Sequence, residues 1–493
     1  MKYLILINLL IYLTICAIAQ TTENIIVGKK EIIYSKVLNE DRKLWIYTPS
    51  ITSQNAISDN RYPVLYLLDG EAHFLSTVGI VQQLSQANGN GVLPEMIIVG
   101  IENTNRLRDL TPVILSSNDL DQANPFVNFL SSELIPYIDK NYKTAPYRLL
   151  VGHSLGGLTA VDIMTNFSHL FNAYIAIDPS MWYSNEKFLK HTMSQLPNQN
   201  LTGRRLFIGT ANTLPGGMTL SKLKNDNSTE TQHIRSIFKL DEFLRNNPSG
   251  LKYAQKFYEN ERHNTLPLIS EYDGLRFVFD YYFFDASEKD FIDSTSLIAT
   301  RLKLHYQKIS EEMGYQVSAP EAFINYLGYD ALNKKQYNKA EALFKLNLES
   351  YPNSNNVFDS YADFLIAKDD TNNAIIHYKK AIEIKEDPST LRKLNLLLKK
   401  ESYNITLKDL QKYAGVYTLE TYNIDIVLEI RDNKLWAKVP GQADSEFIPV
   451  SKDIFTVKDK TDYNITFQMD GDKPIGFTSV QPNGTFEAVY KNK

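Results

Sequence analysis

The chain has 493 residues, of which 43% are hydrophobic and 22% are charged, and its formal net charge at pH 7 is −5. This length favours about two to four domains with sizeable cores, and the mildly acidic balance argues against a nucleic-acid-binding surface. The one cysteine, Cys16, lies near the N-terminus, so the rest of the chain has no disulfide, thiol nucleophile or cysteine metal ligand.

The first 19 residues have the pattern of a secretion signal. Lys2 supplies a positive charge, residues 3–14 are mostly apolar, and Ala17-Ile18-Ala19 matches a small-x-small cleavage site. Cleavage after Ala19 is favoured over a lipid anchor on Cys16, because Ile15 is a poor match for the small residue that usually precedes such a cysteine. We therefore expect a protein that is secreted, periplasmic or extracellular, with no membrane span, since the apolar run is too short to cross a bilayer.

Residues 25–285 alternate strand and helix patterns. Alternating apolar and polar positions over residues 28–49 predict an antiparallel hairpin. Six strands follow, interleaved with four helices, which predicts an α/β domain with a mostly parallel sheet covered on both faces. The strands are expected at 63–68, 96–101, 148–151, 174–177, 205–208 and 254–258, and the helices at 125–138, 155–166, 230–245 and 269–283.

Residues 289–400 have helical patterns with an internal period. The stretches 321–354 and 355–388 align with a period of 34, which resembles tetratricopeptide repeats, and a weaker unit is expected at 289–318. The repeat pairs two small positions and one aromatic position: Gly328 with Ala362, Ala340 with Ala374, and Phe344 with Tyr378. Such repeats can bind a protein partner or mediate self-association, but two units also suit a packing spacer.

Residues 405–493 change to short alternating strands. A short helix is expected at 407–413, strands at 424–430 and 464–469, and turns at Asp432-Asn433 and Asp470-Gly471. This pattern predicts a small antiparallel β-sandwich or barrel, and it contains no catalytic constellation.

The most informative motif is Gly152-His153-Ser154-Leu155-Gly156. It joins a predicted strand to a predicted helix, so Ser154 occupies a sharp turn that the flanking glycines permit. This context predicts Ser154 as a nucleophile and places the Leu155 N–H, at a helix N-terminus, toward a developing oxyanion. A second oxyanion donor is predicted at the Glu71 N–H, because Gly70 permits a tight turn after strand 63–68.

An activated serine needs a base and a group that orients the base. Of the eight histidines, His263 follows the last predicted strand of the region and lies in a polar loop before a helix, which predicts it as the base. His233 falls inside the helix predicted at 230–245, where a solvated face is the simpler interpretation.

The orienting carboxylate is harder to locate. Asn212 follows strand 205–208, where an acid is expected. The next candidate is Asp226, in the polar loop before the helix at 230–245, although a carboxylate there also suits the helix dipole. Glu230 and a Ser–His pair without an acid remain alternatives.

These motifs occur in an order that resembles the esterase branch of the α/β-hydrolase superfamily, which contains siderophore trilactone esterases, S-formylglutathione hydrolases and feruloyl or acetylxylan esterases. The segment Arg108-Asp109-Leu110-Thr111-Pro112 is similar to the siderophore-esterase type, in which it lines the cleft. Asn212 departs from that type, which often carries a glutamate there. The matching stretches cover nearly all of 30–283, about half of the chain: 64–70, 99–101, 106–112, 152–157, 178–182 and His263.

The resemblance implies an α/β-hydrolase fold and substrate contacts from Arg106, Arg108 and Trp182. An arginine can form a fork with an acidic substrate group, and Trp182 can stack on an aromatic or sugar ring, whereas the simpler interpretations are an Arg108–Asp109 ion pair and core packing of the tryptophan. It implies no metal and no cofactor.

The implied activity is a secreted serine carboxylic ester hydrolase that acts through an acyl-enzyme on a small-molecule ester. The substrates implied are a siderophore lactone, a carbohydrate-linked acyl or feruloyl ester, or a small acyl ester. Two alternatives remain open: an acyltransferase on the same fold, and a non-catalytic partner-binding protein that uses the tetratricopeptide-like repeats.

Overall fold

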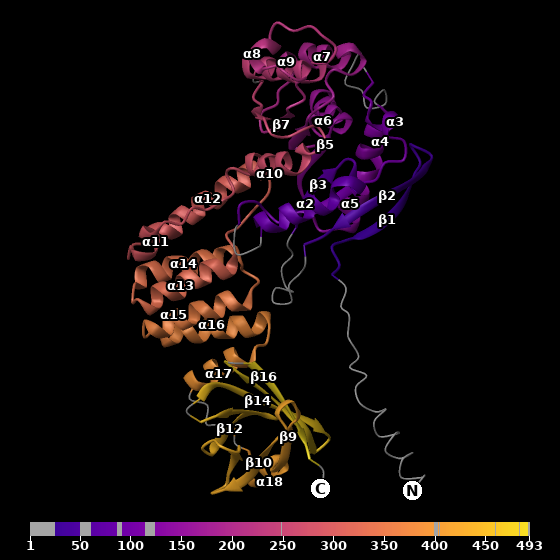
Figure 1. The fold of residues 1–493 in the computed structure, drawn as a ribbon. Coiled ribbons are helices and arrows are strands. Elements are labelled where there is room, and N and C mark those ends of the chain that lie inside the picture. Colours follow the sequence, from indigo (N-terminus) through magenta and orange to yellow (C-terminus); the bar gives the residue numbers. More distant parts are fainter. Residues whose placement is uncertain are drawn as a thin grey trace, which may run out of the picture. The chain divides into compact units, whose positions relative to one another are not determined.

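The structure, a computed structural model, describes residues 25–49, 61–85, 91–113, 124–247, 249–398, 403, 405–458, 460–482 and 484–491. The predicted secretion signal at residues 1–19 lies outside the described residues. The chain divides into two compact units, Met1–Asp285 with Lys308–Gln316, and Ala286–Gln307 with Val317–Lys493. Figure 1 shows the elements of both units coloured in chain order and labels many of them.

The first unit is built on an eight-stranded sheet with the order β1-β2-β4-β3-β5-β6-β7-β8. β1 pairs antiparallel with β2 and β2 pairs antiparallel with β4, whereas the pairs from β4 to β8 are parallel. The predicted hairpin and the six strands after it are confirmed, and the carboxyl ends of the parallel strands meet at one end of the sheet. The bounds are β1 (Lys29–Ser35), β2 (Glu40–Tyr47), β3 (Tyr62–Leu67), β4 (Ile97–Ile101), β5 (Thr144–His153), β6 (Ala173–Ile177), β7 (Arg205–Ala211) and β8 (Lys252–Tyr258).

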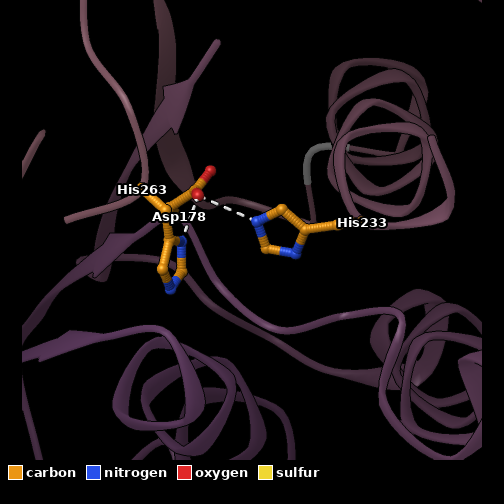
Figure 2. A group of neighbouring side chains, drawn as sticks. All are labelled: Asp178, His233 and His263. Atoms are coloured by element: carbon orange, nitrogen blue, oxygen red, sulfur yellow. Dashed lines mark hydrogen bonds and ion pairs between the residues drawn. The ribbon is translucent and has the colours of Figure 1, made fainter. Parts of the chain in front are cut away.

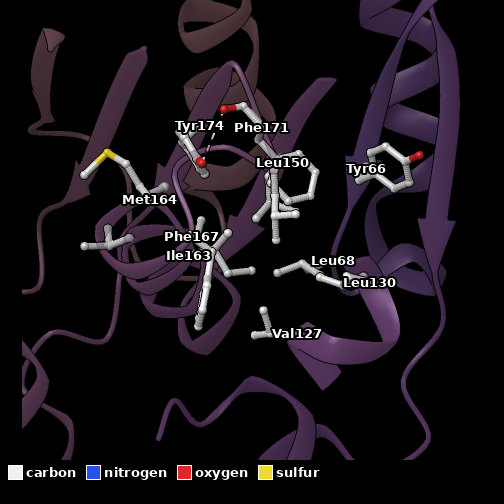
Figure 3. Close-up of a cluster of buried hydrophobic side chains, with 14 of the residues drawn as sticks. Tyr66, Leu68, Val127, Leu130, Leu150, Ile163, Met164, Phe167, Phe171 and Tyr174 are labelled. Atoms are coloured by element: carbon white, nitrogen blue, oxygen red, sulfur yellow. Dashed lines mark hydrogen bonds between the residues drawn. The ribbon is translucent and has the colours of Figure 1, made fainter. Parts of the chain in front are cut away.

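Helices cover the sheet on both faces, because consecutive residues of each buried strand point to opposite sides. Tyr174 and its neighbours Leu150 and Phe171 belong to the apolar cluster that includes the side chains of α6 (Figure 3). Ile175 points the other way, and a Cβ at Gly274 of α10 would lie 2.9 Å from its Cγ2 atom, so α10 packs closely against that face. The helices are α2 (Gly70–Ser85), α3 (Arg106–Leu110), α4 (Pro125–Phe129), α5 (Ile135–Asn141), α6 (Leu155–Asn166), α7 (Tyr183–Gln195), α8 (Leu220–Leu223), α9 (Gln232–Asn246) and α10 (Leu266–Val278).

The helix predicted at 125–138 is divided by a π-turn. The segment Leu130–Leu134 joins α4 to α5 in the π conformation, and Pro136 at the start of α5 follows it. A proline cannot donate an N–H to the preceding turn, which is a common reason for such a local change of helix type.

The second unit begins with helices that form the predicted repeats. Gly328 of α13 faces the ring of Phe344 on α14, where a Cβ would lie 2.7 Å from a ring carbon, so the small and aromatic positions of the repeat meet as predicted. Ala362 and Tyr378 are buried at the equivalent positions of α15 and α16. The helices are α11 (Glu288–Ile292), α12 (Leu297–Met313), of which the part from Lys308 onward belongs to the first unit, α13 (Glu321–Asn333), α14 (Tyr337–Ser350), α15 (Asn355–Ala367), α16 (Thr371–Ile384) and α17 (Pro388–Leu397).

The C-terminal strands close into an antiparallel barrel, with the order β10-β11-β12-β13-β14-β15-β16-β9. This settles the prediction of a sandwich or barrel in favour of the barrel. Its interior is filled with aromatic rings, including Tyr417, Phe467 and Phe477. The elements are α18 (Leu407–Leu410), β9 (Gly415–Leu419), β10 (Ile424–Arg431), β11 (Lys434–Lys438), β12 (Ser445–Ser451), β13 (Ile454–Val457), β14 (Lys460–Asp470), β15 (Lys473–Gln481) and β16 (Gly484–Tyr490). Within the described ranges, no helix combines the length and the hydropathy that crossing a bilayer requires.

Candidate active site

Ser154 lies in a strained turn between β5 and α6. Its backbone angles are φ 60° and ψ −114°, a conformation that a non-glycine residue adopts only when the surrounding structure imposes it. The turn closes so tightly that a Cβ at Gly152 would lie 2.3 Å from the carbonyl oxygen of Gly156. The two glycines of the motif therefore permit the turn, and the strain falls on the serine, as it does in a nucleophile elbow.

The loop after β6 is bound to this turn. The Ser154 N–H donates to the Ile177 carbonyl at 2.9 Å, and the Ser180 N–H donates to the Ser154 carbonyl at 3.0 Å. The two hydroxyl oxygens, Ser154 Oγ and Ser180 Oγ, lie 3.2 Å apart. Among the described residues, Ser154 makes no direct hydrogen bond to a histidine, so the candidate nucleophile is paired with Ser180 in this state.

Asp178, the first residue after β6, is the carboxylate at the centre of the site. Its side chain is fully buried, and its Oδ2 atom accepts hydrogen bonds from His263 Nδ1 at 2.6 Å and from His233 Nε2 at 2.8 Å (Figure 2). Its Oδ1 atom accepts from the Ala211 N–H at 3.0 Å. Burial by itself raises the pKa of Asp178, but the hydrogen bonds from the two imidazoles outweigh it, so this pKa lies well below its usual range.

His263 lies in the loop between β8 and α10, as the sequence predicts. The His153 ring donates from Nε2 to the His263 carbonyl at 2.9 Å, and the two ring centroids are 4.5 Å apart. Burial, together with repulsion from His263 and His73, lowers the pKa of His153 to about 4, so this ring is neutral at neutral pH. Since His263 uses Nδ1 for Asp178, its Nε2 atom remains for a proton transfer with Ser154.

The structure replaces Asp226 by Asp178 as the carboxylate next to His263. The Asp226 carboxylate accepts hydrogen bonds from the Ser228 N–H at 3.2 Å, from the Ser228 hydroxyl at 2.7 Å and from the Thr231 hydroxyl. It thus stabilises the turn before α9, which is the helix-terminus alternative named above. The other sequence candidate, Glu230, is exposed in the same turn.

Asn212, at the position where the acid was expected, binds the loop that carries His263. Its N–H donates to the Glu261 carbonyl at 2.8 Å, and its side-chain amide donates to the Glu259 carbonyl at 2.9 Å. The sequence contained one signal for Asp178: a carboxylate placed directly after strand 174–177, beside the strand that ends in the nucleophile turn. Asp178 is identified as the orienting acid by the closeness of the ends of β5 and β6 in the sheet, whereas the order of residues along the chain does not point to it.

The two predicted oxyanion donors both lie at helix N-termini. Leu155 begins α6 and Glu71 is the second residue of α2, and first-turn N–H groups have no partner within their own helix. The turn before α2 has Asp69 at φ 55°, and a Cβ at Gly156 would lie 3.3 Å from the Asp69 carboxylate, so the two helix starts are neighbours. The arrangement suits an oxyanion hole, and the assignment of the two donors remains a prediction.

The three predicted substrate-contact residues differ in their surroundings. Arg106 forms an ion pair with Asp69 at 2.6 Å, and its side chain is 37% exposed. Arg108 is held between two carboxylates, Glu40 at 2.6 Å and Asp109 at 2.6 Å, so its guanidinium has structural partners, as the ion-pair alternative predicted. Trp182 is 41% exposed at the start of α7, which argues against core packing and leaves its ring accessible.

Asp178, His233 and His263 also offer three metal-ligand atoms within 4.8 Å of one another. Two histidines and a carboxylate form a ligand set that zinc accepts. Here both ring nitrogens approach the same carboxylate oxygen at hydrogen-bond distance, so each nitrogen carries a proton. A metal requires those nitrogens to be deprotonated, and the arrangement therefore fits an oriented acid–base pair better than a metal site.

Comparison with known proteins is consistent with this geometry. Residues 35–232 match the family described as "Putative esterase", and residues 400–488 match a domain of unknown function, DUF3471. Two curated relatives come from Bacillus subtilis (strain 168). The uncharacterized protein YbbA is 28% identical over 166 residues, which cover 32% of this chain and 64% of YbbA. Ferri-bacillibactin esterase BesA is 30% identical over 150 residues, which cover 27% of this chain and 52% of BesA. The chain thus spans less than two thirds of the length of either relative.

Among solved structures, an IroE-like serine hydrolase from Shewanella oneidensis is similar to this protein. It shares 28% sequence identity with a TM-score of 0.53, and the similarity covers 65% of this chain and 99% of that chain.

Proposed function

We propose that this protein, whose residues 35–232 match the family described as "Putative esterase", is a serine carboxylic ester hydrolase that acts through an acyl-enzyme on Ser154. The observation that carries the proposal is the 2.6 Å hydrogen bond between Asp178 and His263 beside the strained Ser154 turn. A nucleophile after β5, an acid after β6 and a base in the loop after β8 form the constellation that activates a serine hydroxyl.

The reaction proceeds in two halves. His263 Nε2 takes the proton of the Ser154 hydroxyl while Oγ bonds to the ester carbonyl carbon, and the resulting oxyanion accepts hydrogen bonds from the Leu155 and Glu71 N–H groups. The carbon–oxygen bond to the alcohol then breaks, and the alcohol leaves with the proton from His263. In the second half, His263 takes a proton from water, the hydroxide attacks the acyl-enzyme, and the carboxylic acid is released as Ser154 recovers its proton.

Asp178 stays ionised throughout. Its carboxylate holds the Nδ1–H tautomer of His263, so that Nε2 faces the reaction with a lone pair, and its negative charge stabilises the imidazolium that forms. The depressed pKa of Asp178 supports this role, because the group remains a hydrogen-bond acceptor over the whole neutral range.

For the substrate, we propose a siderophore ester as the first class and a carbohydrate-linked acyl or feruloyl ester as the second. The relative named ferri-bacillibactin esterase supports the first class. An accessible aromatic ring at Trp182 and the half-exposed Arg106 suit a substrate with aromatic and acidic groups, a description that also covers a feruloyl ester.

Export and partner binding are further parts of the proposal. The secretion signal at residues 1–19 supports a secreted, periplasmic or extracellular location, and N-terminal sequencing of the exported protein would identify the cleavage site. The repeat helices α13 to α16 support a partner or self-association surface.

The decisive experiment compares wild type with Ser154→Ala on p-nitrophenyl acetate and butyrate, methyl ferulate and a ferric trilactone siderophore. Ser221→Ala is the matched control, because Ser221 is an exposed serine whose hydroxyl contacts Thr219. We expect turnover in wild type and the control, and none in Ser154→Ala at an unchanged melting temperature. Turnover retained by Ser154→Ala would overturn the proposal, and product analysis with added acceptor alcohols separates hydrolysis from acyl transfer.

A further inference from the structure

His233 contacts the buried carboxylate of the site from an element that the proposed mechanism does not use. It is the second residue of α9, and its side chain is 18% exposed and lies 2.8 Å from Asp178 Oδ2 through its Nε2 atom. Figure 2 shows the two imidazoles approaching Asp178 from different parts of the chain. The interpretation of His233 as a residue on a solvated helix face is therefore wrong.

We propose that His233 is a positioning residue, which fixes Asp178 as the ionised hydrogen-bond acceptor for His263. The inference rests on the proposed function, because it assigns His233 a role in the same serine-activating site.

The protonation state of His233 follows from its surroundings. Its Nδ1 atom is buried and, in the described part of the chain, has no hydrogen-bond partner. A proton on Nδ1 would be buried and unpaired, which is costly, so the neutral ring with its proton on Nε2 is the favoured form. His233 thus donates to Asp178 as a neutral group, in parallel with His263.

The carboxylate is consequently held by three N–H donors. Rotation of the Asp178 side chain would break the bonds from His233, His263 and Ala211 together, so Oδ2 stays directed at His263. In the fold type that this chain resembles, the acid follows the strand equivalent to β7. Here the acid, Asp178, follows β6, and the hydrogen bond from His233 on α9 fixes the orientation of its carboxylate.

Among the described residues, charged and titratable groups face His233 from the loops after β6 and β8 and from α7. Asp178 and His263 face it from the loops after β6 and β8, and the ring centroids of His233 and His263 are 5.3 Å apart. Helix α7 also packs against α9 and contributes Glu186, which is paired with Lys239 at 2.8 Å. Beyond His263 lies His153, which is neutral at neutral pH.

Removing the second donor has two expected consequences. The carboxylate can rotate, so we expect kcat to fall about 10- to 100-fold, the range seen when the hydrogen-bond partner that orients a metal-binding side chain is removed. The charge of Asp178 is also shared with one imidazole fewer, so it stabilises the His263 imidazolium more strongly, and the acidic limb of the kcat/KM profile moves to higher pH. KM changes little, because His233 touches Asp178 and not the ester.

The test uses three substitutions of His233. His233→Leu removes the donor at similar volume, His233→Gln places an amide N–H near the position of Nε2, and His233→Asn carries an amide that is too short to reach. His191→Leu is the matched control, because His191 is a half-buried histidine on α7 that bonds the neutral Asn166 at 3.2 Å. Each variant is assayed for kcat, KM and the pH profile on p-nitrophenyl acetate, and for the low-field proton resonance of the Asp178–His263 bond.

We expect His233→Leu and His233→Asn to lower kcat, to shift the acidic limb and to broaden the low-field resonance, and His233→Gln to restore most of all three. If His233→Leu does not fold, the comparison of Asn with Gln decides. A Leu or Asn variant that matches His191→Leu in kcat, pH profile and resonance overturns the inference. Failure of the proposed function is a different result, namely no Ser154-dependent turnover in wild type, and the resonance then still reports whether His233 holds the Asp178–His263 pair.

Discussion

Replacing Asp178 by asparagine tests the central contact of the site. The asparagine amide has nearly the shape of the carboxylate, but only one of its two positions can accept a hydrogen bond. Oδ1 is already bound by the Ala211 N–H at 3.0 Å, so the oxygen of the asparagine is held there and its NH2 group faces the two imidazoles. His263 must then present a lone pair at Nδ1 and carry its proton on Nε2, which is the tautomer that cannot accept the proton of Ser154.

The expected loss in kcat is large, because both the tautomer and the negative charge are lost. When an asparagine forces the wrong histidine tautomer in a serine triad, kcat falls by about 10⁴-fold, which corresponds to about 5 kcal/mol of transition-state stabilisation. Asp226→Asn is the matched control, since Asp226 is the carboxylate that chain order suggested and it binds Ser228 and Thr231. For Asp226→Asn we expect kcat within about threefold of wild type, as for other substitutions outside a site.

The assay is steady-state turnover of p-nitrophenyl acetate at pH 7.5, with circular dichroism and thermal melting to establish that both variants are folded. The reasoning is refuted if Asp178→Asn keeps kcat within tenfold of wild type, or if Asp226→Asn loses as much as Asp178→Asn. The first result would indicate a Ser–His pair that works without an acid, and the second would return the acid to the turn before α9.

Three further predictions concern stability and metals. Burial raises the pKa of Glu271 on α10 from 4.5 to about 7, so between these values the folded state binds more protons than the unfolded state, and the free energy of unfolding falls as pH rises. Glu271→Gln should remove up to about 3 kcal/mol of this fall between pH 5 and pH 8, as measured by urea unfolding. An equal fall in wild type and variant would contradict the prediction. Phe344→Ala should destabilise the repeat helices by about 3–5 kcal/mol, because it empties the space opposite Gly328, whereas Tyr326→Ala on the exposed face of α13 should cost under about 1 kcal/mol. EDTA should leave turnover unchanged, and a loss that Zn²⁺ restores would contradict the assignment of Asp178 and His263 as an acid–base pair.

Elements with a strong local pattern were predictable from sequence. The helix at 155–166 has the predicted bounds, and the repeat contact between Gly328 and Phe344 follows from size alone, since only glycine leaves room for the ring. Helix α2 was missed, because Gly70–Ser85 mixes polar and apolar residues without a clear period. Barrel closure was undecided, because it depends on the pairing of β9 with β16, which joins residues about seventy positions apart.

The candidate site divides in the same way. Ser154 and His263 each lie in a short segment between a strand and a helix of the predicted sequence, so a local sequence pattern identifies both. The orienting acid is defined by a distance to His263, and several strand ends can supply it, so chain order alone pointed to Asp226. His233 was missed for the same reason, because its position inside a helix says nothing about the carboxylate that its ring meets.

The position of Asp178 explains why the absence of an acid at Asn212 does not weaken the site. In the sheet, β6 lies between β5, which leads to Ser154, and β7, which ends next to Asn212, so a carboxylate after β6 starts one strand closer to the nucleophile. The base, His263, requires a hydrogen-bond acceptor at Nδ1, and any strand end that places a carboxylate there can provide this acceptor. With the acid after β6, Asn212 is left to bind the Glu259 and Glu261 carbonyls and so to hold the loop of His263. Restoring a glutamate at this position, Asn212→Glu, should therefore lower turnover, because its carboxylate would repel those carbonyls and compete with Asp178 for His263.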